Sequence, residues 1–426
     1  MEKQAAEEKK KALDLQSLKR KRKRRFKKAL RKGHLSYSGL NLCDDFLSSF
    51  DGWVANIPAK WLPPSSRPIQ TLNLRHNAFH SLPPSTFSAS ALYASLTRLD
   101  LGHNQLLYFP EALLQLSNLR HLSLIHNQLT YVPSSLCQLS SLTFLALSHN
   151  RIDWFPLCLL FRLSVLLLNN NLLVSFPQNS SSCSSSSSSS SSSCSSSSRP
   201  SSIITEEDIA AAKQLCSASS PLSVLNLSDN FLQQISPLVF DGAHLPSLTR
   251  LDLSKNRLQY PSSSSASSSG LSSLATLSSL VRLDLSFNAR LKRLPSSLSL
   301  ERLSSLVRLD LRHCRSLVEL PSHFGFPPPF HSSSSSSLTR LDLSYNALLT
   351  QLPPAIGRLS SLRRLNLKST ASLRCLPGDR CSSFCVSAEQ EEVEAEESDK
   401  MTELEARLMK AAVINPQRGR RGDKRI

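Results

Sequence analysis

The chain has 426 residues, enough for a large core. Its net charge is +18, and such an excess of positive charge is seen in nucleic-acid-binding proteins. The start is charged from the second residue, so we expect no secretory signal. The most apolar stretch is interrupted by Arg162 and by Asn169 to Asn171, so we expect no membrane span.

The positive charge is concentrated at the N-terminus. Residues 1–34 carry fifteen Lys and Arg against four acids, and nine of the ten residues from Lys19 to Lys28 are basic. So many adjacent positive charges cannot pack into a core. We therefore expect an exposed basic arm or helix that binds an import receptor or a polyanion. Its binding residues would be Lys19, Arg20, Lys21, Arg22, Lys23, Arg24, Arg25, Lys27 and Lys28.

Residues 35–386 are dominated by one repeated pattern, L-x-x-L-x-L-x-x-N-x-L-x-x-L-P. Successive copies are mostly 21 to 27 residues apart. We expect a further, degenerate copy before them, with Leu40 and Leu42 in its strand and Asp45 in the asparagine slot. The asparagine slot of the eleven clear copies holds Asn77, Asn104, Asn127, Asn150, Asn171, Asn230, Asn256, Asn288, Cys314, Asn346 and Thr370.

This pattern predicts an α/β solenoid shaped as a curved horseshoe. Leucines alternate with polar residues in segments such as 248–253, so each copy supplies one short strand with an apolar face. Such strands bury that face only by stacking in parallel, which forms a concave β-sheet and a continuous core. We expect the buried asparagines to form a structural ladder of backbone hydrogen bonds, with Cys314 and Thr370 as smaller substitutes.

The return segments should form an irregular or short-helical convex side, as the spacing of Leu136, Leu139 and Leu142 indicates. Serine-rich insertions at 178–204, 262–269 and 332–337 fall on this side, and we expect them to be disordered. We expect a helix between the first insertion and the next repeat, with Thr205 as its N-cap. Residues 387–426 form an acidic and then basic tail, expected to be largely disordered with a short helix.

The outward strand slots predict a binding surface on the concave face. Arginine and aspartate alternate there in several repeats, whereas repeats three to six carry apolar side chains, which usually mark an interaction site when exposed. A charged face that is merely solvated remains an alternative for the Arg and Asp slots. The predicted partner-binding residues are His121, Ile125, Phe144, Trp154, Val165, Leu167, Val224, Arg282, Asp284, Arg308, Asp310, Arg340 and Asp342.

Histidine precedes the asparagine in four repeats, where we expect a solvent-facing polar residue with no chemical role. No nucleophile, phosphate-loop or zinc-protease motif occurs. Cys375, Cys381 and Cys385, with distant His313, are the nearest candidate for zinc, but their spacing favours capping cysteines and no metal. The ten cysteines show no paired spacing, which predicts a reduced, intracellular chain.

These motifs resemble intracellular leucine-rich-repeat proteins with Leu-Pro endings, typified by Ras-binding and Ras-suppressor scaffolds. The segment from Phe26 to Leu42 resembles the start of the first repeat in such proteins, including leucine-rich repeat-containing protein forty. The resemblance implies a leucine-rich-repeat solenoid that binds proteins on its concave face. From Asn288 onward the pattern gains a residue and resembles plant-type receptor repeats.

We therefore expect a non-catalytic intracellular scaffold or adaptor, monomeric, without cofactor, and cytoplasmic or nuclear. Its partner would be a protein, with small GTPases, kinases and phosphatases as candidate classes. Two alternatives stay open: a nuclear or nucleic-acid-associated protein that acts through the basic arm, and a regulatory fragment of a larger enzyme.

Overall fold

A computed structural model describes residues 24–25, 28–29, 32–44, 68–84, 86–87, 93–176, 206–215, 220–260, 270–322, 324 and 337–373. The chain divides into two units, Met1–Cys385 and Val386–Ile426, and every described residue lies in the first. The serine-rich insertions, apart from Ser337, and the C-terminal tail lie outside the described residues, so their expected disorder stays a prediction.

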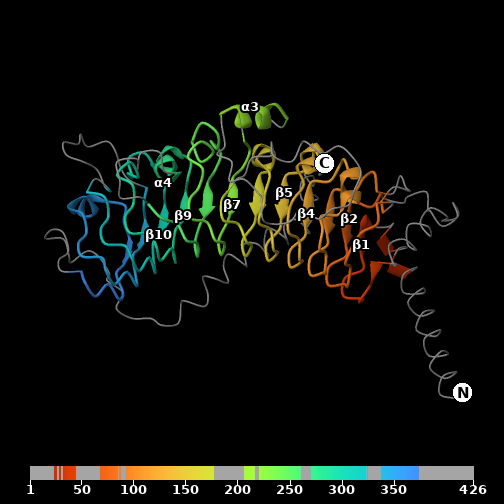
Figure 1. Ribbon diagram of the computed structural model, residues 1–426, viewed down its shortest axis with the longest axis horizontal. Helices are drawn as coiled ribbons and strands as arrows, with labels where there is room; N and C mark the ends of the chain where they lie inside the picture. The colour runs from red at the N-terminus through yellow and green to blue at the C-terminus, as the bar shows by residue number, and fades with distance from the viewer. Residues whose placement is uncertain are drawn as a thin grey trace, which may run out of the picture. The chain divides into compact units, whose positions relative to one another are not determined.

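The described chain forms one parallel sheet of twelve strands, which confirms the predicted solenoid. The strands are hydrogen-bonded in chain order, so each pairs with its neighbours in the sequence, and they lie side by side from β1 to β10 in Figure 1. Each has three residues: β1 His34–Ser36, β2 Thr71–Asn73, β3 Arg98–Asp100, β4 His121–Ser123, β5 Phe144–Ala146, β6 Val165–Leu167, β7 Val224–Asn226, β8 Arg250–Asp252, β9 Arg282–Asp284, β10 Arg308–Asp310, β11 Arg340–Asp342 and β12 Arg364–Asn366.

Alternation along each strand builds the core. The central leucine of every strand pairs in register with the central leucine of the next, as in Leu72 with Leu99, and these leucines are buried. The first and third residues of each strand point to the opposite side of the sheet because successive side chains alternate. This second side is the predicted concave face, called here the open face.

The first strand does not lie where the sequence pattern placed it. β1 is His34–Ser36, and Leu35 pairs with Leu72. Leu40 therefore occupies the asparagine slot rather than the strand, so the predicted register of the degenerate copy was wrong by five residues. Tyr37, buried in the core, fills the position of the second strand leucine, which is why a leucine pattern missed it.

Helical turns occupy the return segments, as predicted. Four of them, including η3 around Leu136, follow a proline with extended backbone, so the proline that ends the repeat pattern sets where these four turns begin. The elements are η2 Glu111–Gln115, η3 Ser134–Gln138, η4 Leu157–Phe161, α3 Glu206–Leu215, α4 Gly270–Ser273, η7 Leu274–Thr276 and η8 Pro354–Arg358.

The predicted helix after the longest insertion is α3. Its first turn is acidic and Lys213 is in its last turn, both favourable with the helix dipole. Ile209 and Ala212 are buried, and the ammonium of Lys213 lies 5.8 Å from the ring centroid of Phe161 in η4. Thr205, the predicted N-cap, is outside the described residues. β6 and β7 still pair directly across this insertion.

The asparagine ladder forms as predicted. Asn150 shows the pattern: its amide donates to the carbonyls of Leu124 and Leu147 in adjacent coils at 3.0 and 2.9 Å, and its oxygen accepts from Leu129 N–H at 3.1 Å. Cys314 keeps the bond to the preceding coil, from Sγ to the carbonyl of Leu285, and Thr370 keeps the bond within its own coil, to the carbonyl of Leu367. The ladder residues are Asn77, Asn104, Asn127, Asn150, Asn171, Asn230, Asn256, Asn288 and Asn346.

Among the described residues, no helix is long and apolar enough to cross a membrane.

Candidate functional site: the open face of the sheet

In the C-terminal half, the open face carries a column of arginines beside a column of carboxylates. The first residue of β8 to β12 is arginine, and these five residues pair in register. The third residue of β8 to β11 is aspartate, and β12 has Asn366 instead. Adjacent parallel strands are about 4.8 Å apart, so like charges follow one another closely in both columns. We call these sets the arginine column (Arg250, Arg282, Arg308, Arg340 and Arg364) and the carboxylate column (Asp252, Asp284, Asp310 and Asp342).

The carboxylate column holds the backbone of the solenoid in place. One oxygen of Asp284 accepts from the N–H and the hydroxyl of Ser286, at 3.0 and 2.7 Å, and Asp252 and Asp342 do the same with Ser254 and Ser344. These bonds close the turn that follows each strand. Asp284 and Asp310 are buried, at 7% and 1% exposure. The sequence pattern gave no sign that these predicted binding residues hold the backbone.

Close stacking also changes the charge of this column. Burial raises the pKa of Asp310 to about 8, with a further rise from the carboxylates of Asp284 and Asp342. Burial and the neighbouring Asp284 raise the pKa of Asp252 to about 7. The raised pKa values of Asp252 and Asp310 mean that these two side chains favour the protonated form near neutral pH, whereas arginine stays charged.

The arginine column remains accessible at its C-terminal end. Arg340, Arg363 and Arg364 are exposed and, with Thr339, line a cavity of about 310 Å³. Further back, Arg308 is half-buried and lies 3.5 Å from a carboxylate oxygen of Asp310. Of the predicted charged binding residues, the structure thus presents Arg340 to solvent and commits Asp310 to internal contacts.

The apolar part of the open face differs from the expectation. Phe144 and Leu167 are 6% and 2% exposed, so the prediction that they are exposed was wrong. Both are packed between side chains of neighbouring strands: the ring of Phe144 stacks 5.6 Å from that of His121, and Leu167 has Ala146 and Asn226 as register partners. Half-buried members of the predicted set are His121, Ile125, Trp154, Val165 and Val224.

Three aromatic side chains lie in the turns beside this area. Tyr131 and Trp154 are half-buried and are joined by a parallel backbone bridge. Tyr108, in the preceding turn, is 67% exposed, the largest value among the exposed apolar side chains that the structure describes. The apolar surface available for binding is therefore half-buried rather than exposed. We call it the apolar strip (Ile125, Trp154, Val165 and Val224).

The histidine–asparagine pairs have a structural explanation. The residue before the asparagine slot has a left-handed backbone in each of eleven repeats, with φ between 51° and 60°, a conformation in which Asn, Asp and His are enriched. The rings of His76, His103, His126 and His149 stack with centroids 4.2, 4.2 and 4.0 Å apart. We call these four residues the histidine column.

Three members of the histidine column, His103, His126 and His149, favour the neutral form. Arg75 donates from Nη2 to Nε2 of His103 at 2.7 Å, which requires an unprotonated nitrogen there. Burial, followed by the positive charge of Arg75 and the neighbouring histidines, lowers the pKa of His103 to about 4. Burial also lowers the pKa of His126 and of His149.

No cluster of three metal-binding side chains occurs in the described part of the chain. His313, the distant member of the candidate zinc set, instead stacks between the rings of Phe287 and Tyr345, at 4.4 and 4.2 Å. Cys375, Cys381 and Cys385 lie outside the described residues, as do six members of the basic arm, Lys19 to Lys23 and Lys27. Of the arm, Arg24 and Lys28 are exposed, and Arg25 donates to the carbonyl of Ser36 in β1 at 3.3 Å.

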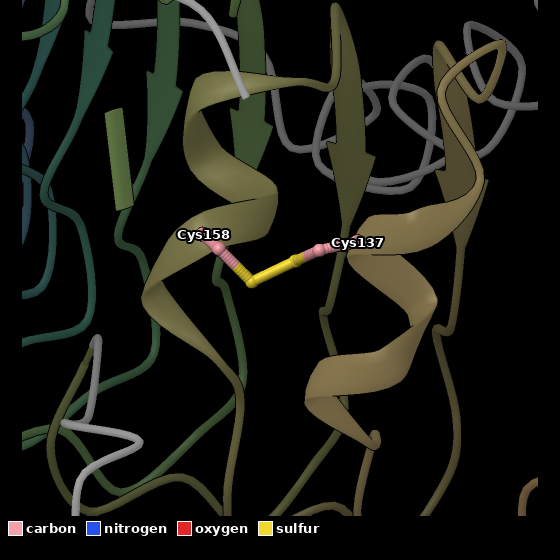
Figure 2. The surroundings of a disulfide bond; sticks show 2 residues. All are labelled: Cys137 and Cys158. Carbon is pink, nitrogen blue, oxygen red and sulfur yellow. A yellow bond between two sulfur atoms is a disulfide. The ribbon is translucent and has the colours of Figure 1, made fainter. Parts of the chain in front are cut away.

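Two cysteines are paired, contrary to the expectation from their spacing. Figure 2 shows a disulfide between Cys137 of η3 and Cys158 of η4, with Cα atoms 6.4 Å apart. The two residues occupy different positions in their turns, the fourth of η3 and the second of η4, so the repeat pattern did not indicate the pairing. Cys43 and Cys314 are free.

Sequence models described as leucine-rich repeat match residues 67–129, 94–152, 220–278 and 337–359. The matched repeats are leucine-rich repeats. The matched segments include strands β2 to β5, β7, β8 and β11, and leucine-rich-repeat domains are generally protein-interaction modules without catalysis. The finer resemblance to intracellular Ras-binding scaffolds is not decided by these matches.

Several solved structures are similar to this chain, and two of the three named here are described as leucine-rich-repeat proteins. One from Leptospira interrogans has 23% identity and a TM-score of 0.42, and the match covers 79% of this chain and 76% of that one. The APL1 leucine-rich-repeat domain has 22% identity and a TM-score of 0.48, covering 72% and 66%. YopM from Yersinia enterocolitica has 22% identity and a TM-score of 0.41, covering 75% and 50%. No curated protein sequence matches significantly.

Proposed function

We propose that this leucine-rich-repeat protein is a non-catalytic scaffold that binds a protein partner on the open face of its sheet. The observation that carries the proposal is the continuous open face itself. Twelve in-register strands form it, and the side chains on it differ in character from one part of the sheet to another. Its N-terminal half offers a half-buried apolar strip and its C-terminal half offers exposed arginines. Apolar contacts of this kind contribute affinity, whereas the charges set orientation and association rate.

A capture experiment with the full chain tests this proposal. Ile125→Lys with Val224→Lys places two charges on the apolar strip at positions that are half-buried. Gln115→Lys with Gln138→Lys makes the same change of charge on exposed return turns, and serves as the matched control. We expect the first pair to lose a partner that the parent and the control both capture, at an unchanged melting temperature. Equal capture by the two pairs would refute binding on the open face.

We also propose an intracellular site of action, in the cytoplasm or the nucleus, supported by the resemblance to intracellular repeat proteins. The Cys137–Cys158 pair supplies a direct test, because disulfides persist mainly in oxidising compartments. Alkylation of both thiols in intact cells supports the proposal. A pair that stays oxidised, while the free Cys43 is alkylated, overturns it.

A further inference from the structure

At the C-terminal end of the open face, three arginines lie close together without acidic side chains paired to them in the described part of the chain. Arg340 and Arg364 are register partners on β11 and β12, and Arg363 precedes the second of them. All three are exposed and line one cavity of about 310 Å³ with Thr339. Among the described residues, no acid forms an ion pair with any of the three arginines.

The aspartate on these two strands already has hydrogen-bond partners. On β11 and β12, Asp342 is the single aspartate of the open-face slots, because Asn366 replaces the next one. One oxygen of Asp342 accepts from Ser344, and the other accepts from the amide of Asn366 at 3.1 Å. Three guanidiniums thus surround a cavity, and the one carboxylate that the structure describes on β11 and β12, Asp342, has hydrogen-bond partners at both oxygens.

We propose that this cavity binds an oxyanion, a phosphate or a carboxylate, on an extended acidic peptide segment of the partner. Guanidinium groups pair with such groups through two parallel hydrogen bonds, and three of them suit a doubly charged phosphate. Side chains on one face of an extended peptide recur about every 6.6 Å, so acids that flank the central oxyanion would lie over the strands on either side of the cavity. This inference rests on the proposed function and narrows it to the partner's chemistry.

A peptide fits this surface better than a nucleic acid does. Single-stranded nucleic acids need an uninterrupted basic groove with aromatic side chains for stacking. The residues that line this cavity, Thr339, Arg340, Arg363 and Arg364, include no aromatic side chain. An oxyanion on a peptide needs no such stacking partner.

Fluorescence anisotropy with the full chain and labelled nine-residue peptides tests the proposal. The peptides share glutamates at both ends and differ at the centre, which is phosphoserine, glutamate or serine, and a fourth peptide replaces every acid with glutamine. We expect the phosphoserine or the glutamate peptide to bind at least about tenfold more tightly than the neutral one, a difference that a single charge-assisted contact supplies. The ranking of those two distinguishes phosphate from carboxylate.

Matched variants locate the binding. Arg340→Ala with Arg364→Ala should weaken binding of the acidic peptides by at least about tenfold. Arg290→Ala with Arg315→Ala removes the same charge from exposed positions outside the strands and should leave binding unchanged. Equal binding of the neutral peptide, equal binding by the two double variants, no binding at all, or tighter binding of a nine-nucleotide RNA would each overturn the inference.

The two proposals fail in different ways. If the cavity variant binds peptides normally while Ile125→Lys with Val224→Lys loses the natural partner, the oxyanion site is wrong and the scaffold function stands. If the peptides bind at the cavity but neither double variant affects capture of the natural partner, the proposed function is wrong.

Discussion

The asparagine in each repeat shows how one side chain replaces several missing backbone partners. The amide of Asn150 donates to three carbonyl oxygens, including that of Ser148 at 3.3 Å, while its oxygen accepts the N–H of Leu129. Asn150 is buried, so water cannot take over these bonds. Loss of the side chain leaves buried polar groups without partners, each costing about 1–3 kcal/mol.

Asn150→Ala should therefore lower the free energy of unfolding by more than about 2 kcal/mol, measured by urea denaturation. Asn118→Ala is the matched control, because Asn118 makes one exposed bond to the carbonyl of Ala94. Its effect should stay below about 1 kcal/mol. Equal losses in the two variants would show that the ladder bonds contribute no more than a surface bond.

His103 gives a second consequence at this scale. Its pKa in the folded chain is about 4, below the ordinary value of 6.5. Between these values the unfolded chain binds a proton that the folded chain does not, so stability is lost as the pH falls from 6.5 toward 4. His103→Asn keeps a residue that tolerates the left-handed backbone. Thermal melts at pH 7.5 and 4.5 should show a smaller acid-induced drop for this variant; an unchanged drop contradicts the prediction.

At the scale of elements, in-register stacking brings like residues together, with both favourable and unfavourable results. Leucines and histidine rings gain contacts from it. Aspartates at the third strand position repel one another, and the pKa of Asp310 rises to about 8 because of burial and its charged neighbours. A raised pKa means that ionisation is less favourable in the folded chain than in the unfolded one. Stability from this group is thus present below about pH 4 and is lost as the pH rises through 8.

Asp310→Asn should remove this loss. Asparagine keeps the oxygen that closes the turn, as Asn226 and Asn366 do at the same position of β7 and β12. Its amide can also donate to a neighbouring aspartate, as Asn366 donates to Asp342. We expect the variant to be more stable than the parent by at least about 1 kcal/mol at pH 9, and similar to it at pH 4. Lower stability at pH 9 would mean that the charge of Asp310 is needed by Arg308 and Arg312.

At the scale of the whole sheet, each coil contacts its neighbours in the stack, so a local change should propagate only a short way. Leu167 lies on the open face of β6, but its burial makes it part of the packed structure. A charge introduced there has no partner at hand and should disrupt the coils of β5 to β7.

Leu167→Asp should lower stability by about 3 kcal/mol or more, rather than act on binding alone. Hydrogen exchange should accelerate in β5 to β7, while β9 to β11 keep their protection. Arg340→Asp, a change to the same residue type at an exposed position, should leave the exchange pattern unchanged. A Leu167→Asp chain with parental exchange rates would restore the interpretation that this side chain is free for a partner.

The sequence by itself determined the repeat and therefore the fold, because leucine and asparagine recur at spacings that only stacked parallel strands satisfy, as Leu72, Leu99 and Asn77 illustrate. It also located the arginine column, since the positions of β8 to β12 follow from the repeat pattern. Only the tertiary structure decided which of these side chains remain accessible. Phe144, Leu167 and Asp310 are buried because neighbouring strands about 4.8 Å apart crowd their side chains, a property of the stack that no single repeat encodes. The same holds for Cys137 and Cys158, which meet only because adjacent turns bring unlike repeat positions together.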